Sequence, residues 1–119
     1  YYAKGLPLEP ADSLVSYLLH NNLGFCLNLA GDHEKAAVYC RSAIRIDPAR
    51  HNAHKNLALA MQGLGRHEEA ARAYLAAIER EPRDRRALGH LTEMIEEHPE
   101  VTEMVPEVLD VLDRWEDGM

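Results

Sequence analysis

The chain has 119 residues, a formal net charge of −7 and two cysteines, which indicates one domain with a single shared core. The negative charge argues against a nucleic-acid binder that relies on general electrostatic attraction to phosphates. No apolar run reaches the roughly 18 residues of a membrane span, and no signal peptide is present, so we expect a cytoplasmic protein without membrane insertion.

The charge is concentrated at one end of the chain. Residues 93–119 hold ten acidic residues and one basic residue, whereas residues 1–92 hold ten acidic and twelve basic residues. An acidic tail of this kind is usually a solvated face. The alternative is that Glu93, Glu96 and Glu97 attract a basic partner.

The sequence repeats with a period of 34 residues. The segment NNLGFCLNLAGDHEKAAVYCRSAIRIDP, which starts at Asn21, aligns with KNLALAMQGLGRHEEAARAYLAAIEREP, which starts at Lys55. The matched pairs include Asn22/Asn56, Leu23/Leu57, Leu27/Met61, Gly31/Gly65, His33/His67, Ala36/Ala70, Ala43/Ala77 and Pro48/Pro82. Each unit is predicted to form two helices, and such units stack on their neighbours.

The predicted elements follow in chain order. They are the end of a preceding repeat's helix at residues 1–10, a first clear repeat at 11–50, a second repeat at 51–84 and a degenerate third repeat at 85–117. The first repeat opens with a helix near residues 12–29. The degenerate repeat is expected to act as a polar cap, with a last helix that begins near Thr102 and holds Pro106 in its first turn.

Capping residues set the expected helix ends. Gly31 and Gly65 are predicted to stop the first helix of each repeat, because glycine just after a helix adopts the left-handed conformation at low cost. Asp32 is expected to cap the start of the next helix. The second helices are predicted to end at Asp47 and Glu81, because the proline after each disfavours helical backbone.

The spacing of small and large residues resembles the tetratricopeptide repeat family. The matching residues are Leu23, Gly24, Leu27, Ala36, Cys40, Ala43 and Pro48 in one unit, and Leu57, Ala58, Met61, Ala70, Tyr74, Ala77 and Pro82 in the next. His20 and His54 stand where the family often has Trp. The resemblance implies an all-α fold, a right-handed superhelix of antiparallel helix pairs in one domain, and a non-catalytic protein-interaction function as a scaffold or adaptor.

The resemblance also implies that the first helix of each pair lines a concave groove, which binds a peptide or protein segment. These helices carry many side-chain amides on one face, and an amide pairs with both the N–H and the C=O of an extended peptide. Asn22 and Asn56, which occupy the same position in successive repeats, are expected to contact the ligand backbone. The predicted groove residues are Asn21, Asn22, Phe25, Asn28, Asn52, Lys55, Asn56, Leu59, Gln62, Arg86, His90 and Glu93.

Three alternatives stay open for this protein. The amides of Asn22 and Asn56 could serve the scaffold alone. The chain could self-assemble through its N-terminal edge, where residues 1–8 lack a partner helix. It also resembles the carboxylate clamp of co-chaperone members of the family. Asn56 and Arg86 match, and His90 stands where a basic residue is usual, whereas Asn21 and Phe25 replace the residues expected on the first repeat.

The pattern of histidines and cysteines predicts neither a metal site nor a catalytic site. Zinc needs three or four converging ligands, and the seven histidines have scattered acidic and thiol neighbours, so we expect no metal or cofactor. Cys26 and Cys40 form no CxxC motif and are predicted to be reduced thiols packed in the core. No nucleophile elbow, phosphate loop or HExxH motif occurs, so we expect no enzyme and no catalytic residue.

Overall fold

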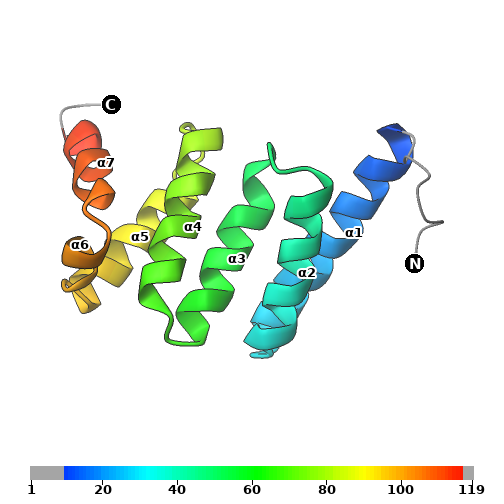
Figure 1. The fold of residues 1–119 in the computed structure, drawn as a ribbon, viewed down its shortest axis with the longest axis horizontal. Coiled ribbons are helices and arrows are strands. Elements are labelled where there is room, and N and C mark those ends of the chain that lie inside the picture. Colours follow the sequence, from blue (N-terminus) through cyan, green and yellow to red (C-terminus); the bar gives the residue numbers. More distant parts are fainter. Residues whose placement is uncertain (1–9, 117–119) are drawn as a thin grey trace.

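The chain folds as a row of helices packed side by side (Figure 1). The computed structural model describes residues 10–116, with side chains over residues 12–114. Its helices are α1 (Pro10–Leu29), α2 (His33–Ile46), α3 (His51–Gly63), α4 (His67–Arg80), α5 (Arg86–Glu97), α6 (Val101–Met104) and α7 (Glu107–Glu116). No strand occurs within residues 10–116, which confirms the predicted all-α fold. The right-handed sense of the superhelix stays a prediction, and the expected helix end at residues 1–9 lies outside the described residues.

The helix ends form where the capping residues predicted them. Gly31 and Gly65 have φ of 84° and 78°, the left-handed region that suits glycine. After these turns the backbone N–H of Asp32 donates to the carbonyl of Leu27, and that of Arg66 donates to the carbonyl of Met61. Asp32 also caps α2, because its side chain accepts from the backbone N–H of Lys35.

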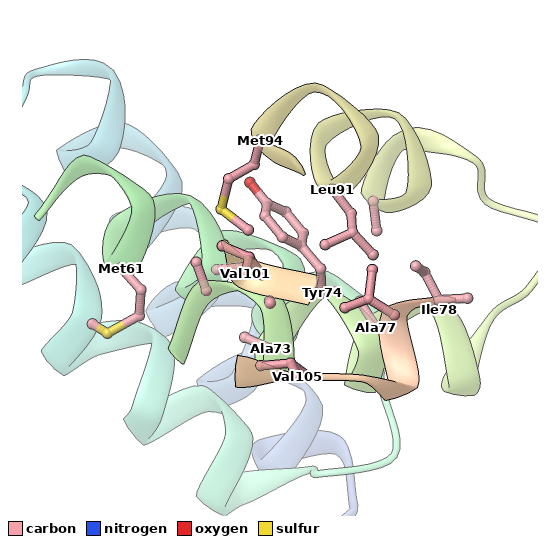
Figure 2. Close-up of a cluster of buried hydrophobic side chains, with 14 of the residues drawn as sticks. Met61, Ala73, Tyr74, Ala77, Ile78, Leu91, Met94, Val101 and Val105 are labelled. Atoms are coloured by element: carbon pink, nitrogen blue, oxygen red, sulfur yellow. The ribbon is translucent and has the colours of Figure 1, made fainter. Parts of the chain in front are cut away.

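The main core runs along the α3–α4 pair and continues to the C-terminal helices. Tyr74 of α4 is fully buried, together with Leu91 and Met94 of α5 and Val101 and Val105 further on. Figure 2 shows Leu91, Met94 and Val101 around the Tyr74 ring, with Val105 further from it. Small residues on α3 and α4 let the two backbones approach closely, and the ring fills the space between α4 and α5.

A second, smaller cluster joins the first repeat to the second. Tyr17 of α1 is 1% exposed and packs with Ala43 of α2 and Ala53 of α3. The Tyr17 hydroxyl accepts a hydrogen bond of 3.1 Å from the backbone N–H of Ala53, in the first turn of α3. Because Arg50 makes no side-chain cap there, Tyr17 satisfies a helix N–H that would otherwise lack a partner.

Two expectations about the fold were wrong, one about Pro106 and one about Cys26. Pro106 does not lie in the first turn of a helix that begins near Thr102. Instead the helix stops at Met104, Val105 is non-helical with φ −134° and ψ 76°, and α7 starts at Glu107. The residue before a proline is driven out of the α conformation, so Pro106 separates two helices and lies at the start of the second.

One of the two thiols also differs from its prediction. Cys40 is buried in the core as expected, but Cys26 is exposed on α1. The pKa of Cys40 is raised to about 12 by burial, so this thiol stays protonated. Among residues 10–116 no helix has the length and apolar content needed to cross a membrane.

Candidate functional site

The predicted groove residues lie on three helices of the row. Asn21, Asn22, Phe25 and Asn28 are on α1, Asn52, Lys55, Asn56, Leu59 and Gln62 are on α3, and Arg86, His90 and Glu93 are on α5. We call this set of residues the first-helix face. Its members differ in exposure: four are exposed (Asn22, Phe25, Arg86 and Glu93), three are buried (Asn21, Lys55 and Asn56), and the others are intermediate.

Amide side chains connect α1 to α3. The side-chain amide of Asn56 donates a 2.9 Å hydrogen bond to the side-chain carbonyl of Asn21, and both residues are buried. The Asn28 amide donates a second 2.9 Å bond to the backbone carbonyl of Asn56. The Asn28 side-chain carbonyl in turn lies 3.0 Å from Nδ1 of His33 at the start of α2. This network fixes the register of three helices.

Asn22 and Asn56 therefore differ in environment although they are repeat equivalents. Asn56 is 3% exposed between α1 and α3, whereas Asn22 is exposed on α1, which has no earlier first helix beside it within the described chain. The Oδ1 atom of Asn56 is buried and has no hydrogen-bond partner among the described residues. Asn21, rather than Asn22, is the side chain that Asn56 contacts.

This difference predicts opposite results for two alanine substitutions. Asn56→Ala should lower the free energy of unfolding by about 1 kcal/mol, because the buried carbonyl of Asn21 loses its donor. Asn22→Ala should leave it unchanged or slightly higher, because alanine is the better helix former at an exposed position. Urea unfolding followed by circular dichroism measures both, and equal effects would contradict the assignment.

Lys55 is a buried cation on the first-helix face. It is 8% exposed, and its pKa is lowered by burial and by the charge of Arg86, with Asp84 acting in the opposite direction. No ion pair or hydrogen bond joins its ammonium group to another described residue. Asn56 Oδ1 is the one fully buried side-chain N or O atom without a hydrogen-bond partner among the described residues, so the Lys55 ammonium group reaches solvent, where a ligand can supply an acceptor.

The carboxylate that raises the pKa of Lys55, Asp84, is paired with other residues. The Asp84 carboxylate accepts two hydrogen bonds from Nε of Arg86, of 2.9 and 3.2 Å, and lies 3.0 Å from Nε2 of His51. The Arg86 guanidinium holds the pKa of Asp84 well below its usual range. Sequence reasoning missed Asp84, although its place two residues before Arg86 in a helix-start loop was the available signal.

Tyr74 of α4 contacts two residues of the first-helix face, Gln62 and His90. Its hydroxyl donates a 2.6 Å hydrogen bond to the side-chain carbonyl of Gln62, and its ring stacks on His90 with centroids 6.0 Å apart. Burial, with a smaller contribution from Glu93, raises the pKa of Tyr74. Gln62 and His90 are thus ordered by a core residue on α4 before any ligand arrives.

Two cavities lie away from this face. One of about 590 Å³ lies between α4 and α7, and another of about 510 Å³ is lined by residues of α2, α3 and α4. His54 lines the second cavity, and its Nε2 lies 3.0 Å from the carbonyl of Pro48. Within the described residues, no group of three histidine, cysteine or acidic side chains is placed to hold a metal ion.

The packed helix pairs, their 34-residue period and their glycine stops define a helical-repeat protein. The sequence model of the family described as Tetratricopeptide repeat matches residues 27–94, from the end of α1 into α5. The chain therefore belongs to the tetratricopeptide repeat family, whose repeats generally mediate protein–protein interaction and are typically non-catalytic. No curated protein matches the chain.

Proposed function

We propose that the chain binds an extended segment of a partner protein across its first-helix face, in a scaffold or adaptor role. The observation that carries this proposal is Lys55, a cation 8% exposed with no ion pair among the described residues. A carboxylate or backbone carbonyl of the bound segment would supply the missing acceptor, and charge-assisted hydrogen bonds are the stronger kind.

Exposed residues of α1 supply the other contacts. Asn22 offers an amide to the backbone of the segment, and Phe25, 44% exposed on the next turn, offers an apolar surface to one of its side chains. Asn21 and Asn56 hold α1 against α3, so their part is to position this surface. Partner recognition is thus divided between an ordered scaffold and a few exposed contacts.

The arrangement differs from a carboxylate clamp with two free cations. Asp84 occupies the guanidinium of Arg86 through several hydrogen bonds, which leaves Lys55 as the cation available to an acceptor. We therefore propose recognition of an internal acidic or extended segment, in which a free C-terminus is not required. Amidation of the C-terminal carboxylate of a bound peptide should therefore change its Kd less than twofold.

The experiment uses a displayed library of random peptides selected on the purified chain. Selected peptides are titrated by fluorescence anisotropy against the wild type and Lys55→Met. Methionine keeps the length of the side chain and removes the charge, so binding should weaken about tenfold. The free energy of unfolding should stay equal or rise, because the ammonium group has no ion pair among the described residues and the largely buried side chain becomes apolar.

The matched control is Lys35→Met, which removes a lysine whose side chain is 73% exposed on α2. This variant should bind the selected peptides as the wild type does. Equal affinities for the wild type, Lys55→Met and Phe25→Ala would contradict the proposal, because the peptides would then bind another surface.

A further inference from the structure

The cavity of about 510 Å³ lined by α2, α3 and α4 has an apolar part and a charged part. Helix α3 lies between the other two helices in the row (Figure 1). It contributes Leu57 and Met61 to the apolar part, α2 contributes Ile44, and α4 contributes Ala73. We call this hollow the α2–α4 cavity. Ligand pockets occupy roughly 300–1,000 Å³, so it has room for a bulky side chain of a partner.

The charged part of the α2–α4 cavity is positive, although the chain as a whole has a formal net charge of −7. Arg41 and Arg45 of α2 and Arg72 of α4 line it, against one acidic residue, Glu69. His54 also lines the cavity, and burial lowers its pKa, so it adds no positive charge at neutral pH. Arg41 and Arg45 are four residues apart on one helix, where like charges repel.

The two arginines of α2 are poorly neutralised by the described chain. Arg41 pairs with Glu69 at 3.9 Å, with side chains 45% and 55% exposed, and its other contact is the Met61 sulfur at 3.8 Å. An exposed ion pair of this length stabilises little. Arg45 donates to the neutral Ser42 hydroxyl and has no ion pair among the described residues. Since a guanidinium group has five N–H donors, both arginines have donors left for a ligand.

The cavity between α4 and α7 shows that this charge is not a general property of the repeat. The residues 34 positions after Arg41 and Arg45 are Leu75 and Glu79, and both line that cavity. Two further carboxylates come from α7. Arg72 lines both cavities, but its guanidinium pairs with carboxylates of α4 and α7 at 3.5 and 3.4 Å. Uncommitted positive charge is therefore specific to the α2 side of the α2–α4 cavity.

We propose that the α2–α4 cavity binds an acidic segment of a partner protein, in which one bulky apolar side chain is flanked by carboxylates. The apolar side chain packs on Leu57 and Met61, and the carboxylates pair with Arg41 and Arg45. Guanidinium and carboxylate groups form strong, often bidentate hydrogen bonds, and these pairs also offset the repulsion between the two arginines. None of the lining residues belongs to the first-helix face, so this inference does not depend on the proposed function.

Three fluorescein-labelled peptides with blocked termini test the ligand chemistry by fluorescence anisotropy. The probe peptide has one Trp between two pairs of glutamates, and it should bind the wild type with a submillimolar Kd. Alanine in place of Trp should weaken binding about tenfold, because no apolar side chain fills the cavity. Lysines in place of the glutamates should abolish binding. No binding of the probe at millimolar concentration, or equal binding of either matched peptide, would overturn the proposal.

Two double variants of equal charge locate the bound peptide. Arg41→Gln/Arg45→Gln should weaken binding of the probe peptide about tenfold, with an unchanged circular dichroism spectrum. The matched control, Arg66→Gln/Arg83→Gln, removes two exposed arginines that do not line the cavity, and it should leave the Kd unchanged. Equal weakening by both pairs would mean attraction by net charge alone and would overturn the proposal. Loss of binding in Lys55→Met would place the peptide on the first-helix face and would also overturn it.

Discussion

Tyr74→Ala should lower the free energy of unfolding by about 3–5 kcal/mol, the largest loss we expect from any single truncation in this chain. The ring is fully buried and lies among Ala77, Leu91 and Met94 in the main core (Figure 2). Alanine would leave a cavity between α4 and α5 that rigid helices fill only in part. A single domain is stable by about 5–15 kcal/mol, so the variant should unfold at much lower urea concentration.

Two further variants separate packing from hydrogen bonding at this position. Tyr74→Phe keeps the ring but removes the 2.6 Å bond to Gln62, and it should cost about 1 kcal/mol. Cys40→Ala truncates the smaller residue in the equivalent position of the first repeat, and it should cost less than Tyr74→Ala. Urea unfolding followed by circular dichroism measures all three. A loss of less than 1 kcal/mol for Tyr74→Ala would contradict the central packing role of the ring.

Much of the fold was predictable because its signals are local. Glycine at Gly31 and Gly65 and the caps at Asp32 and Asp47 act within a few residues, so a single sequence predicts the helix ends correctly. A helix boundary near Pro106 was predictable, but the start predicted for the last helix, near Thr102, was wrong. Two rules competed there, tolerance of proline in a first turn and exclusion of helix from the residue before it, and the second rule ended α6 at Met104.

The site was less predictable because burial depends on neighbours that the repeat pattern does not specify. The 34-residue period makes Asn22 and Asn56 equivalent, yet within the described residues only Asn56 has an earlier first helix, α1, beside it, and that helix buries it against Asn21. The contact between His51 and Asp84 spans 33 residues and follows from stacking. Cys26 is exposed although thiols are usually buried, and the repeat pattern alone did not indicate this.

Gly24→Leu should lower the free energy of unfolding by about 3 kcal/mol, at the upper end of the range for overpacked cores. A Cβ added at Gly24 would meet the Cys40 sulfur at 2.5 Å and the backbone carbonyl of Ala36 at 3.3 Å. The first distance is shorter than side chains tolerate, and the carbonyl belongs to the backbone of α2. Helices α1 and α2 would have to separate, because neither the buried thiol nor the helix backbone has room to move.

A short series of variants tests whether the close approach of α1 and α2 at Gly24 causes the loss of stability. Gly24→Ala should cost less than leucine, since one methyl group clashes and alanine is the better helix former. Gly89→Ala is the matched control on α5, where an added Cβ meets nothing within 4 Å, and it should raise the free energy of unfolding by about 1 kcal/mol. Combining Gly24→Ala with Cys40→Ala should recover part of the loss, because the clashing sulfur is gone. Additive losses in this double-mutant cycle would show that Gly24 and Cys40 do not interact, and the α1–α2 contact would then need another explanation.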